Sequence, residues 1–208
     1  MSQIENALIS ADNFKSKLTY FVLFIDGMSG RKTRHFYNNI CSEKNVRYLE
    51  IGSWKGSTIC SAMQGNQING ICIDNWSEFG GPKNVFLKNF KKCRGKNKVE
   101  FIECDCWLVD VNSLGKFNIY MYDGNHTETS HYRALNYYLS NLDGQFIYLV
   151  DDWNFQDVRK GTLNAIKENK IDILYQKEII TNTDNKHSLL SGVDSFWHNG
   201  ISIFILQL

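Results

Sequence analysis

Blocks of apolar residues follow one another along the chain, and their period switches between that of strands and that of helices. From residue 46 onward, short apolar runs of strand length alternate with segments whose apolar residues recur at helical spacing. This pattern predicts strands at 46–51, 70–74, 99–104, 117–123, 146–150, 171–180 and 201–206. It predicts helices at 57–63, from Pro82 through Phe90, at 128–142 and at 158–166. Alternation over this length indicates an α/β fold with a mostly parallel sheet and helices on both faces.

The first 45 residues follow a different pattern, which predicts a helical addition. Residues 3–18 carry apolar positions at amphipathic spacing, 20–25 form a short apolar run, and 26–30 form a turn. The basic run 31–35 then precedes further periodic apolar residues, and we interpret it as the solvated start of a helix rather than as a contact for an anionic substrate. We therefore expect a single domain over 1–208, with a helical segment at 1–45 and an α/β core at 46–208.

Composition narrows the class of protein. A content of 43% hydrophobic and 22% charged residues is ordinary for a globular domain, and 208 residues can bury a core without disulfides or metal. A formal net charge of +1 disfavours broad electrostatic binding to nucleic acid. Six cysteines without paired zinc spacing indicate reduced thiols in a cytoplasmic compartment. The N-terminal stretch does not read as a secretory signal, and the apolar run at 20–25 is too short to span a membrane.

The segment 49–58, LEIGSWKGST, carries the first chemical signal. Its apolar run ends at Glu50 and breaks into a turn with glycines at positions 52 and 56, after which Ser57 or Thr58 can open a helix. Glycines there lack the side chains that would hold a ligand away from the backbone. Two glycines four residues apart also occur in ordinary tight turns. The turn indicates a nucleotide-like cofactor, and the spacing leaves its identity open.

Acidic residues stand at the ends of consecutive predicted strands. They are Glu50, Asp74, Asp123 and the pair Asp151 and Asp152, with Asp105 just beyond the third strand. In a parallel sheet these ends meet at one edge, where ligands bind. Each acid alone could cap a helix. Several carboxylates at one edge repel one another unless a ligand or cation relieves the repulsion, so the set predicts a binding site.

Four segments, 49–58, 73–76 (IDNW), 122–126 (YDGNH) and 149–153 (LVDDW), together resemble the class I S-adenosylmethionine-dependent methyltransferases. Within that family the chain is similar to the branch that includes the metal-dependent sugar and macrolide O-methyltransferases. The likeness covers 46–155 by motif and continues to the C-terminus by element order. It implies a Rossmann-like, seven-stranded, mostly parallel sheet whose last strand is antiparallel, which suits 201–206.

The resemblance also implies a cofactor site for S-adenosylmethionine. Matched residue by residue, this site consists of Glu50, Gly52, Ser53, Gly56, Ser57, Asp74, Asn75, Asp105, Trp107 and Asp123. The glycine turn would hold the methionine part of the cofactor, Asp74 the ribose hydroxyls, and Asp105 with Trp107 would border the adenine. Asp74 follows the turn by about 20 residues, the distance usual for a ribose-binding acid.

A metal site and a catalytic base follow from the same resemblance. Asp123, Asp151 and Asp152 match the metal ligands of that branch, and His126 matches the general base, with Asp123 as the second catalytic residue. Mg²⁺ prefers carboxylate oxygens and acidifies a bound hydroxyl, whose proton an imidazole can accept near neutral pH. The implied reaction is Mg²⁺-assisted methylation of a hydroxyl on a small polar or sugar-like acceptor.

Two departures from the family pattern keep other functions open. Trp54 stands where many relatives have a middle glycine, and Asn125 where many have an aspartate. These departures favour, as an alternative, a non-catalytic cofactor-binding or assembly module of the same fold. An NAD-dependent enzyme is a weaker third hypothesis, because no basic residue lines up with the turn to neutralise a pyrophosphate. His126 could instead cap a helix. The sequence leaves the acceptor and the oligomeric state open, and a homo-oligomer is compatible with it.

Overall fold

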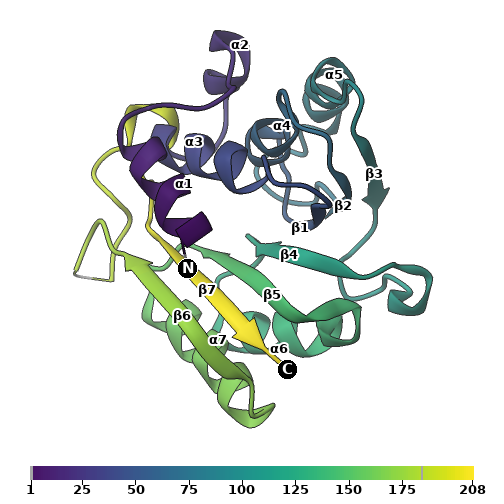
Figure 1. The fold of residues 1–208 in the computed structure, drawn as a ribbon, viewed down its shortest axis with the longest axis vertical. Coiled ribbons are helices and arrows are strands. Elements are labelled where there is room, and N and C mark those ends of the chain that lie inside the picture. The colour runs from purple at the N-terminus through teal and green to yellow at the C-terminus, as the bar shows by residue number, and fades with distance from the viewer. Residues whose placement is uncertain (1, 184) are drawn as a thin grey trace.

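The computed structural model describes residues 2–183 and 185–208 and contains a seven-stranded sheet (Figure 1). The strands are β1 Arg47–Ile51, β2 Asn69–Asp74, β3 Lys98–Glu103, β4 Phe117–Tyr122, β5 Leu142–Asp151, β6 Asp172–Ile179 and β7 Ile201–Gln207. Their order in the sheet is β3-β2-β1-β4-β5-β7-β6. All pairs are parallel except those of β7, which runs antiparallel to both β5 and β6. The expected fold class is confirmed.

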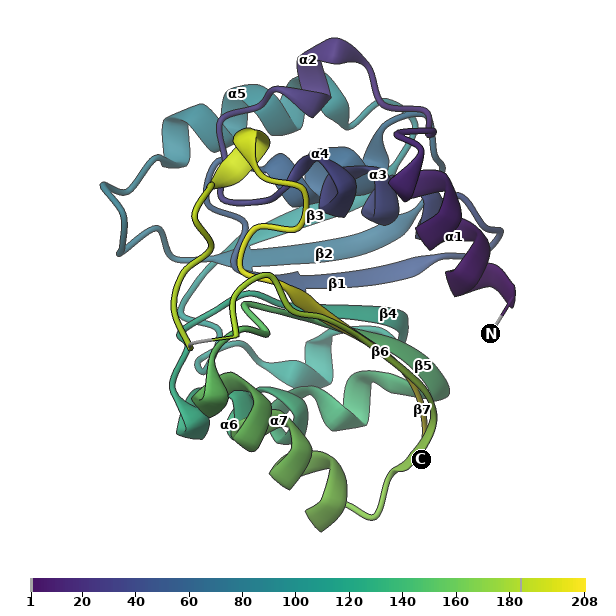
Figure 2. The same ribbon diagram turned by 90° about the vertical axis from the view of Figure 1, so that its left-hand side faces the viewer.

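Helices cover both faces of the sheet (Figure 2). They are α1 Ser2–Asp12, α2 Tyr20–Leu23, α3 Arg31–Ile40, α4 Ser57–Met63, α5 Lys83–Cys93, α6 Glu128–Tyr138 and α7 Gln156–Glu168. Figure 2 shows α1 to α5 on one side of the sheet and α6 with α7 on the other. Side chains of β1 alternate between the two cores: Tyr48 packs with the α1–α5 layer, while Leu49 and Ile51 pack with the α6–α7 layer.

The strand order places the candidate residues at one edge. From β1 the sheet grows toward β2 and β3 in one direction and toward β4 and β5 in the other. The carboxyl ends of β1, β2, β4 and β5 therefore surround the point where the strand order reverses, the usual ligand position in such sheets. The expected acids at these strand ends share this edge.

The N-terminal helix is shorter than the predicted 3–18, because α1 ends at Asp12. Phe14 adopts a left-handed backbone conformation with φ +53°, and the N–H of Lys15 donates to the carbonyl of Ser10 at 2.8 Å. This is the geometry of a helix C-cap. The apolar spacing continues past the cap, so spacing alone did not indicate the end of the helix.

The region around residue 142 also differs from the prediction. Helix α6 ends at Tyr138, a short 3₁₀ turn spans Leu139–Asn141, and β5 begins at Leu142 rather than at residue 146. Asp143 and Gly144, which lie between the predicted helix and the predicted strand, are thus part of the strand. The carbonyl of Gly144 accepts a hydrogen bond from the N–H of Leu208 at 2.8 Å, so a partner distant in sequence extends the strand.

The basic run 31–35 begins a helix, α3, as predicted, but most of it is buried rather than solvated. Arg34 is fully buried, and its guanidinium donates to the backbone carbonyls of Leu23, Ile25, Gly27 and Ser29 at 2.6–3.2 Å. Burial lowers the pKa of Arg34 to about 10, which still leaves the side chain charged at neutral pH. The hydroxyl of Ser29 lies 2.9 Å from that of Ser57 at the start of α4. Arg34 therefore fastens the 23–29 loop beside the glycine turn.

Within 2–183 and 185–208, every helix falls short of the length and apolar character that a bilayer crossing requires.

Candidate functional site

The glycine turn joins the ends of β1 and β4. Gly52 has φ +86°, and a Cβ built there would lie 1.9 Å from the backbone oxygen of Asp123. The N–H of Asp123 donates to the carbonyl of Ile51 at 2.9 Å, and that of Gly52 to Ile73 at 2.9 Å. A side chain at position 52 would push the two strand ends apart. The turn expected to hold the cofactor thus touches the first of the acids expected to hold the metal.

Trp54 adopts a backbone conformation that usually favours glycine. Its backbone has φ +43°, in the left-handed region. One carboxylate oxygen of Asp74 accepts hydrogen bonds from the N–H groups of Ser53 and Trp54 at 2.8 and 2.7 Å. The indole N–H of Trp76 donates to the carbonyl of Trp54 at 2.8 Å. These contacts stabilise the turn despite the large side chain, so the Trp54 departure preserves the path of the loop.

Both carboxylate oxygens of Asp74 accept hydrogen bonds from backbone N–H groups in or near the glycine turn. Besides its two contacts with the turn, its second oxygen accepts from the N–H of Trp76 at 2.6 Å. A carboxylate oxygen can accept two hydrogen bonds, so the second oxygen can accept one further donor. The neighbouring Asn75 is exposed and accepts from Ser77.

The residues expected near the adenine lie beyond β3. One oxygen of Asp105 accepts from the N–H of Trp107 at 2.9 Å, which holds this short loop in place. The indole of Trp107 lies 4.4 Å from the guanidinium carbon of Arg133 and packs edge-on against Tyr137. Both expected residues are half-buried.

Glu50 is a fully buried acid beneath the turn. Its carboxylate accepts hydrogen bonds from the hydroxyls of Tyr48, Ser53 and Thr58 at 2.9, 2.8 and 3.0 Å. Burial raises the pKa of Glu50 to about 7, although these hydrogen bonds oppose the rise. A cationic ligand above the turn would favour the ionised form.

A group of titratable side chains lies next to the turn. Ligand atoms of Asp123, His126 and Asp152 all lie within 4.8 Å of one another, and Nε2 of His126 is 2.7 Å from Oδ2 of Asp152. Burial and the charge of Asp152 raise the pKa of Asp123. Burial alone would lower the pKa of His126, but the hydrogen bond and charge of Asp152, with the charge of Asp123, raise it to about 8.

Asp151 stands apart from this group of three. It is the last residue of β5 and belongs to the strand face that carries Leu149 in the α1–α5 core, whereas Asp152 follows the strand. Its Oδ1 is buried and has no hydrogen-bond partner among the described residues. Burial and the charges of Asp123 and Asp152 raise its pKa. The expected triad of Asp123, Asp151 and Asp152 is therefore adjacent in space, but the structure gathers His126, not Asp151, with the other two.

The alternative helix-cap interpretation of His126 does not match the geometry. Helix α6 is capped by Thr127, whose hydroxyl accepts from the N–H of Ser130 at 3.2 Å. Asn125 accepts from the N–H of Thr127 at 3.2 Å and so supports this cap. The ring of His126 instead stacks on Phe155, with centroids 5.9 Å apart and planes at 12°.

Sequence reasoning missed the residues that reach the site from the loop between β6 and β7, residues 180–183 and 185–200. The amide nitrogen of Asn199 lies 2.6 Å from Oδ1 of Asp152 and 3.2 Å from Nδ1 of His187. The His187 ring packs edge-on against Phe155. No motif marks these residues. The one available signal was the expected antiparallel last strand, whose start must lie at the edge where the parallel strands end.

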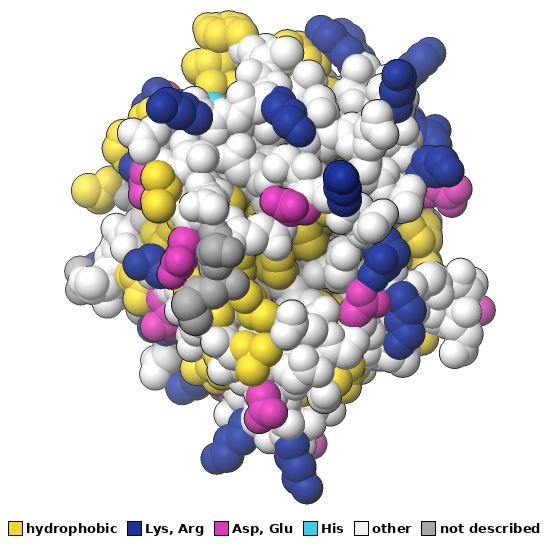
Figure 3. All heavy atoms as spheres, viewed as in Figure 1, with side chains coloured by type: hydrophobic (Ala, Val, Ile, Leu, Met, Phe, Trp, Pro, Cys, Tyr) yellow, Lys and Arg dark blue, Asp and Glu magenta, His cyan; other side chains and the backbone are white. Residues whose placement is uncertain are grey.

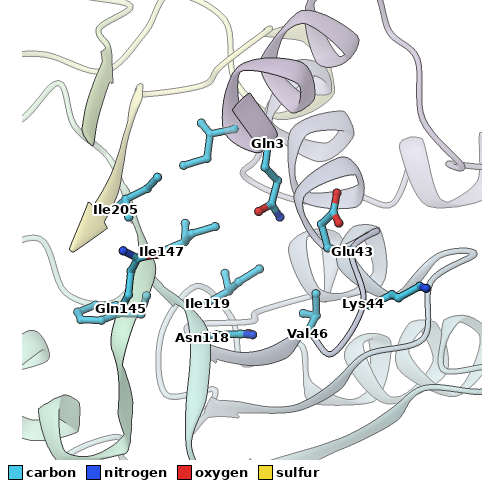
Figure 4. A pocket seen from close by; sticks show the side chains of 11 residues that line it. Gln3, Glu43, Lys44, Val46, Asn118, Ile119, Gln145, Ile147 and Ile205 are labelled. Atoms are coloured by element: carbon cyan, nitrogen blue, oxygen red, sulfur yellow. The ribbon is translucent and has the colours of Figure 1, made fainter. Parts of the chain in front are cut away.

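A separate cavity of about 330 Å³ lies at the opposite edge of the sheet (Figure 4). Its lining includes Gln3 of α1, Glu43, Asn118, Gln145 and Ile205. None of the expected site residues lines it, so it is distinct from the candidate site.

The fold is that of the class I S-adenosylmethionine-dependent methyltransferases, as likeness to solved structures shows. The O-methyltransferase from Bacillus cereus, solved with S-adenosylhomocysteine, has a TM-score of 0.57 and 9% identity, covering 100% of this chain and 91% of its own. The ribosomal protein L11 methylase from Lactobacillus delbrueckii subsp. bulgaricus has a TM-score of 0.56 and 14% identity, covering 85% of this chain and 77% of its own.

A third similar structure, TrmN from Thermus thermophilus, has a TM-score of 0.52 and 9% identity and covers 78% of this chain. This chain spans only 44% of the length of TrmN, and 49% and 48% of two further methyltransferase structures. No protein-family model and no curated protein matches the sequence. The similar proteins include enzymes named for different acceptors, so the fold leaves the acceptor open.

Proposed function

We propose that the chain is an S-adenosylmethionine-dependent methyltransferase that methylates a hydroxyl of a small polar or sugar-like acceptor with the help of a divalent cation, Mg²⁺. The contact between Gly52 and the backbone of Asp123 carries this proposal. It makes the glycine turn continuous with the group of Asp123, His126 and Asp152. A methyl donor on the turn would lie beside a hydroxyl held at that group, as a direct transfer requires.

The cofactor side suits a sulfonium compound. Glu50 and Asp74 lie beneath and beside the turn, and we propose that they favour a ligand carrying positive charge. Gly52, Ser53, Gly56 and Ser57 would follow the methionine part. Asp74 and Asn75 would contact the ribose, and Asp105 and Trp107 the adenine.

The donor atoms at the proposed metal site are of the kind that a divalent cation prefers. The half-buried carboxylate of Asp123 and the buried one of Asp152 offer oxygen ligands, and Oδ1 of Asp151, which has no hydrogen-bond partner among the described residues, is a buried acceptor that a cation would satisfy. Asp123 and Asp152 would hold the ion, with Asp151 behind them. When bound, Mg²⁺ would polarise the acceptor hydroxyl and lower its pKa.

His126 is proposed as the general base. Its pKa of about 8 in the metal-free protein keeps the imidazole protonated at neutral pH, and a protonated imidazole cannot accept a proton. Positive charge at the neighbouring carboxylates would lower this pKa, because like charges disfavour the protonated ring. The neutral ring, stacked on Phe155, would then take the hydroxyl proton.

The near-neutral net charge favours a small acceptor over nucleic acid. On the face drawn in Figure 3, Lys and Arg side chains gather toward the upper right, where α5 lies, and are mixed with Asp and Glu side chains elsewhere. A net charge of +1 supports a small acceptor, whereas the basic stretch 83–98 on and after α5, with seven Lys and Arg residues and no acid, is the part of the chain that would favour nucleic acid. We propose that residues 1–208 act as one domain in the cytoplasm.

Calorimetry with S-adenosylhomocysteine and transfer of a labelled methyl group to a panel of sugars and other hydroxyl compounds test this proposal. We expect micromolar cofactor binding, transfer that EDTA abolishes and Mg²⁺ restores, and loss of transfer in Asp152→Asn. Transfer unaffected by EDTA would exclude the metal while leaving the transferase. Cofactor binding without transfer to any acceptor would favour the non-catalytic module, and binding of NADH in place of S-adenosylhomocysteine would exclude the proposal.

A further inference from the structure

The loop between β6 and β7 is held against the end of β5 by asparagine side chains. The Oδ1 of Asn154 accepts from the N–H groups of Thr181 and Asn182, and its Nδ2 donates to the hydroxyl of Thr181 at 2.9 Å. The N–H of Asn154 donates to the carbonyl of Asn199 at 2.9 Å. In Figure 2 this loop, yellow-green to yellow, runs along the side of the molecule that also carries the connection from β2 to α5. The loop thus closes over the edge where the candidate site lies.

Within this loop, Asn199 is placed to act on Asp152. Its side chain is buried, with 3% exposure, and both ends of its amide have partners. The Oδ1 accepts from the N–H of Ser188 at 2.9 Å, and the Nδ2 donates to Oδ1 of Asp152 at 2.6 Å. A backbone N–H can only donate and a carboxylate oxygen accepts, so these two partners determine which way the amide points.

Asp152 is a residue whose orientation requires support. Its backbone has φ +58°, a left-handed conformation that is costly for a residue with a side chain, and the residue is 4% exposed. One oxygen faces Asn199 and the other faces His126 at 2.7 Å. Two donors on different oxygens fix the plane of the carboxylate, and with it the direction of the lone pairs that a cation would use.

We propose that Asn199 is a positioning residue for the cation site: its amide, whose direction is fixed by the N–H of Ser188, orients the carboxylate of Asp152. The inference rests on the proposed metal-assisted function. Groups that orient the ligands of a metal commonly account for 10- to 100-fold in affinity, about the size expected here. The amide nitrogen of Asn199 also lies 3.2 Å from Nδ1 of His187, so the same loop brings this imidazole next to the amide that contacts Asp152.

The test measures Mn²⁺ affinity by electron paramagnetic resonance of free Mn²⁺, with S-adenosylhomocysteine affinity by calorimetry as a second readout. The variants are Asn199→Ala and Asn199→Ser, the second keeping a small polar side chain if the first fails to fold. Asn154→Ala is the matched control. It removes buried amide contacts to the same loop, and within 2–183 and 185–208 the side-chain hydrogen bonds of Asn154 do not include one to Asp152.

We expect Asn199→Ala to weaken Mn²⁺ binding by about 10- to 100-fold, with S-adenosylhomocysteine affinity unchanged and Asn154→Ala close to the unmodified protein in both. Unchanged Mn²⁺ affinity in folded Asn199 variants would overturn the inference. Equal weakening in Asn199→Ala and Asn154→Ala would also overturn it, because loop order alone would then explain the effect. If the unmodified protein binds no Mn²⁺, the proposed metal function itself fails.

Discussion

Glu50 makes the stability of the protein depend on pH in an unusual direction. Burial raises its pKa from 4.5 in an exposed chain to about 7 in the fold. Between these values the folded state holds a proton that the unfolded state has released, so the free energy of unfolding falls as the pH rises. At about 1.4 kcal/mol for each pKa unit, the ionised form costs the fold about 3 kcal/mol above pH 7.

The variant Glu50→Gln isolates this effect. Glutamine has nearly the same shape and can still accept from the hydroxyls of Ser53 and Thr58. Near pH 4.5 the protonated acid and the amide are alike, and the two proteins should have similar stability. Near pH 8 the variant should be more stable by about 3 kcal/mol. Asp151, whose pKa is raised by burial and by Asp123 and Asp152, contributes about equally to both proteins, whereas the pKa of Asp123 is raised in part by Glu50 and adds to the difference in the same direction.

Urea unfolding at a series of pH values, followed by tryptophan fluorescence, measures the difference between the two proteins. A difference that stays constant from pH 4.5 to 8 would refute the buried-acid argument. A second readout tests its link to function. At pH 8 the variant should lose affinity for the sulfonium S-adenosylmethionine by about tenfold more than for uncharged S-adenosylhomocysteine, since only the former pairs with an ionised acid.

Two further substitutions test the architecture of the site. Gly52→Ala should lower the free energy of unfolding by more than about 2 kcal/mol and abolish S-adenosylhomocysteine binding in calorimetry, because the added Cβ would overlap the carbonyl of Asp123. Gly115→Ala, where a Cβ meets nothing within 4 Å, should change neither, and equal effects would contradict the steric argument. Arg34→Met should cost about 2–4 kcal/mol in chemical unfolding, since several buried carbonyls lose their donor. The exposed ion pair removed in Lys32→Met should cost at most about 1 kcal/mol, and a loss as large as that of Arg34→Met would contradict the buried role of Arg34.

Much of the fold could be predicted because its signals are local. Strands buried on both faces read as continuous apolar runs, and helices read as periodic ones, so β1, β4 and α4 lie close to their predicted positions. The ends of helices and strands were harder to predict from the sequence. The start of β5 depends on hydrogen bonds to the C-terminal residue Leu208, and the end of α1 on a left-handed residue, Phe14.

The candidate site could also be predicted only in part from the sequence. Its glycines and acids stand next to strands in the sequence, so a sheet with parallel strands had to bring them to one edge. The sequence alone did not show which side of the strand each acid occupies. Asp151 and Asp152 therefore looked equivalent, although the structure gives them different surroundings. The role of Asp151 and the general-base role of His126 stay predictions until the cation is tested.

By itself, the sequence determined the alternating α/β order, the glycine turn and the row of acids, because each depends on neighbouring residues in the chain. Only the tertiary structure decided that Arg34 is an internal clamp, that His126 joins Asp123 and Asp152, and that Asn199 reaches Asp152 from a loop 47 residues away in sequence. These contacts join segments distant in the chain. Their partners are selected by the direction of β7 and by the need of buried polar groups for hydrogen bonds, which no local pattern records.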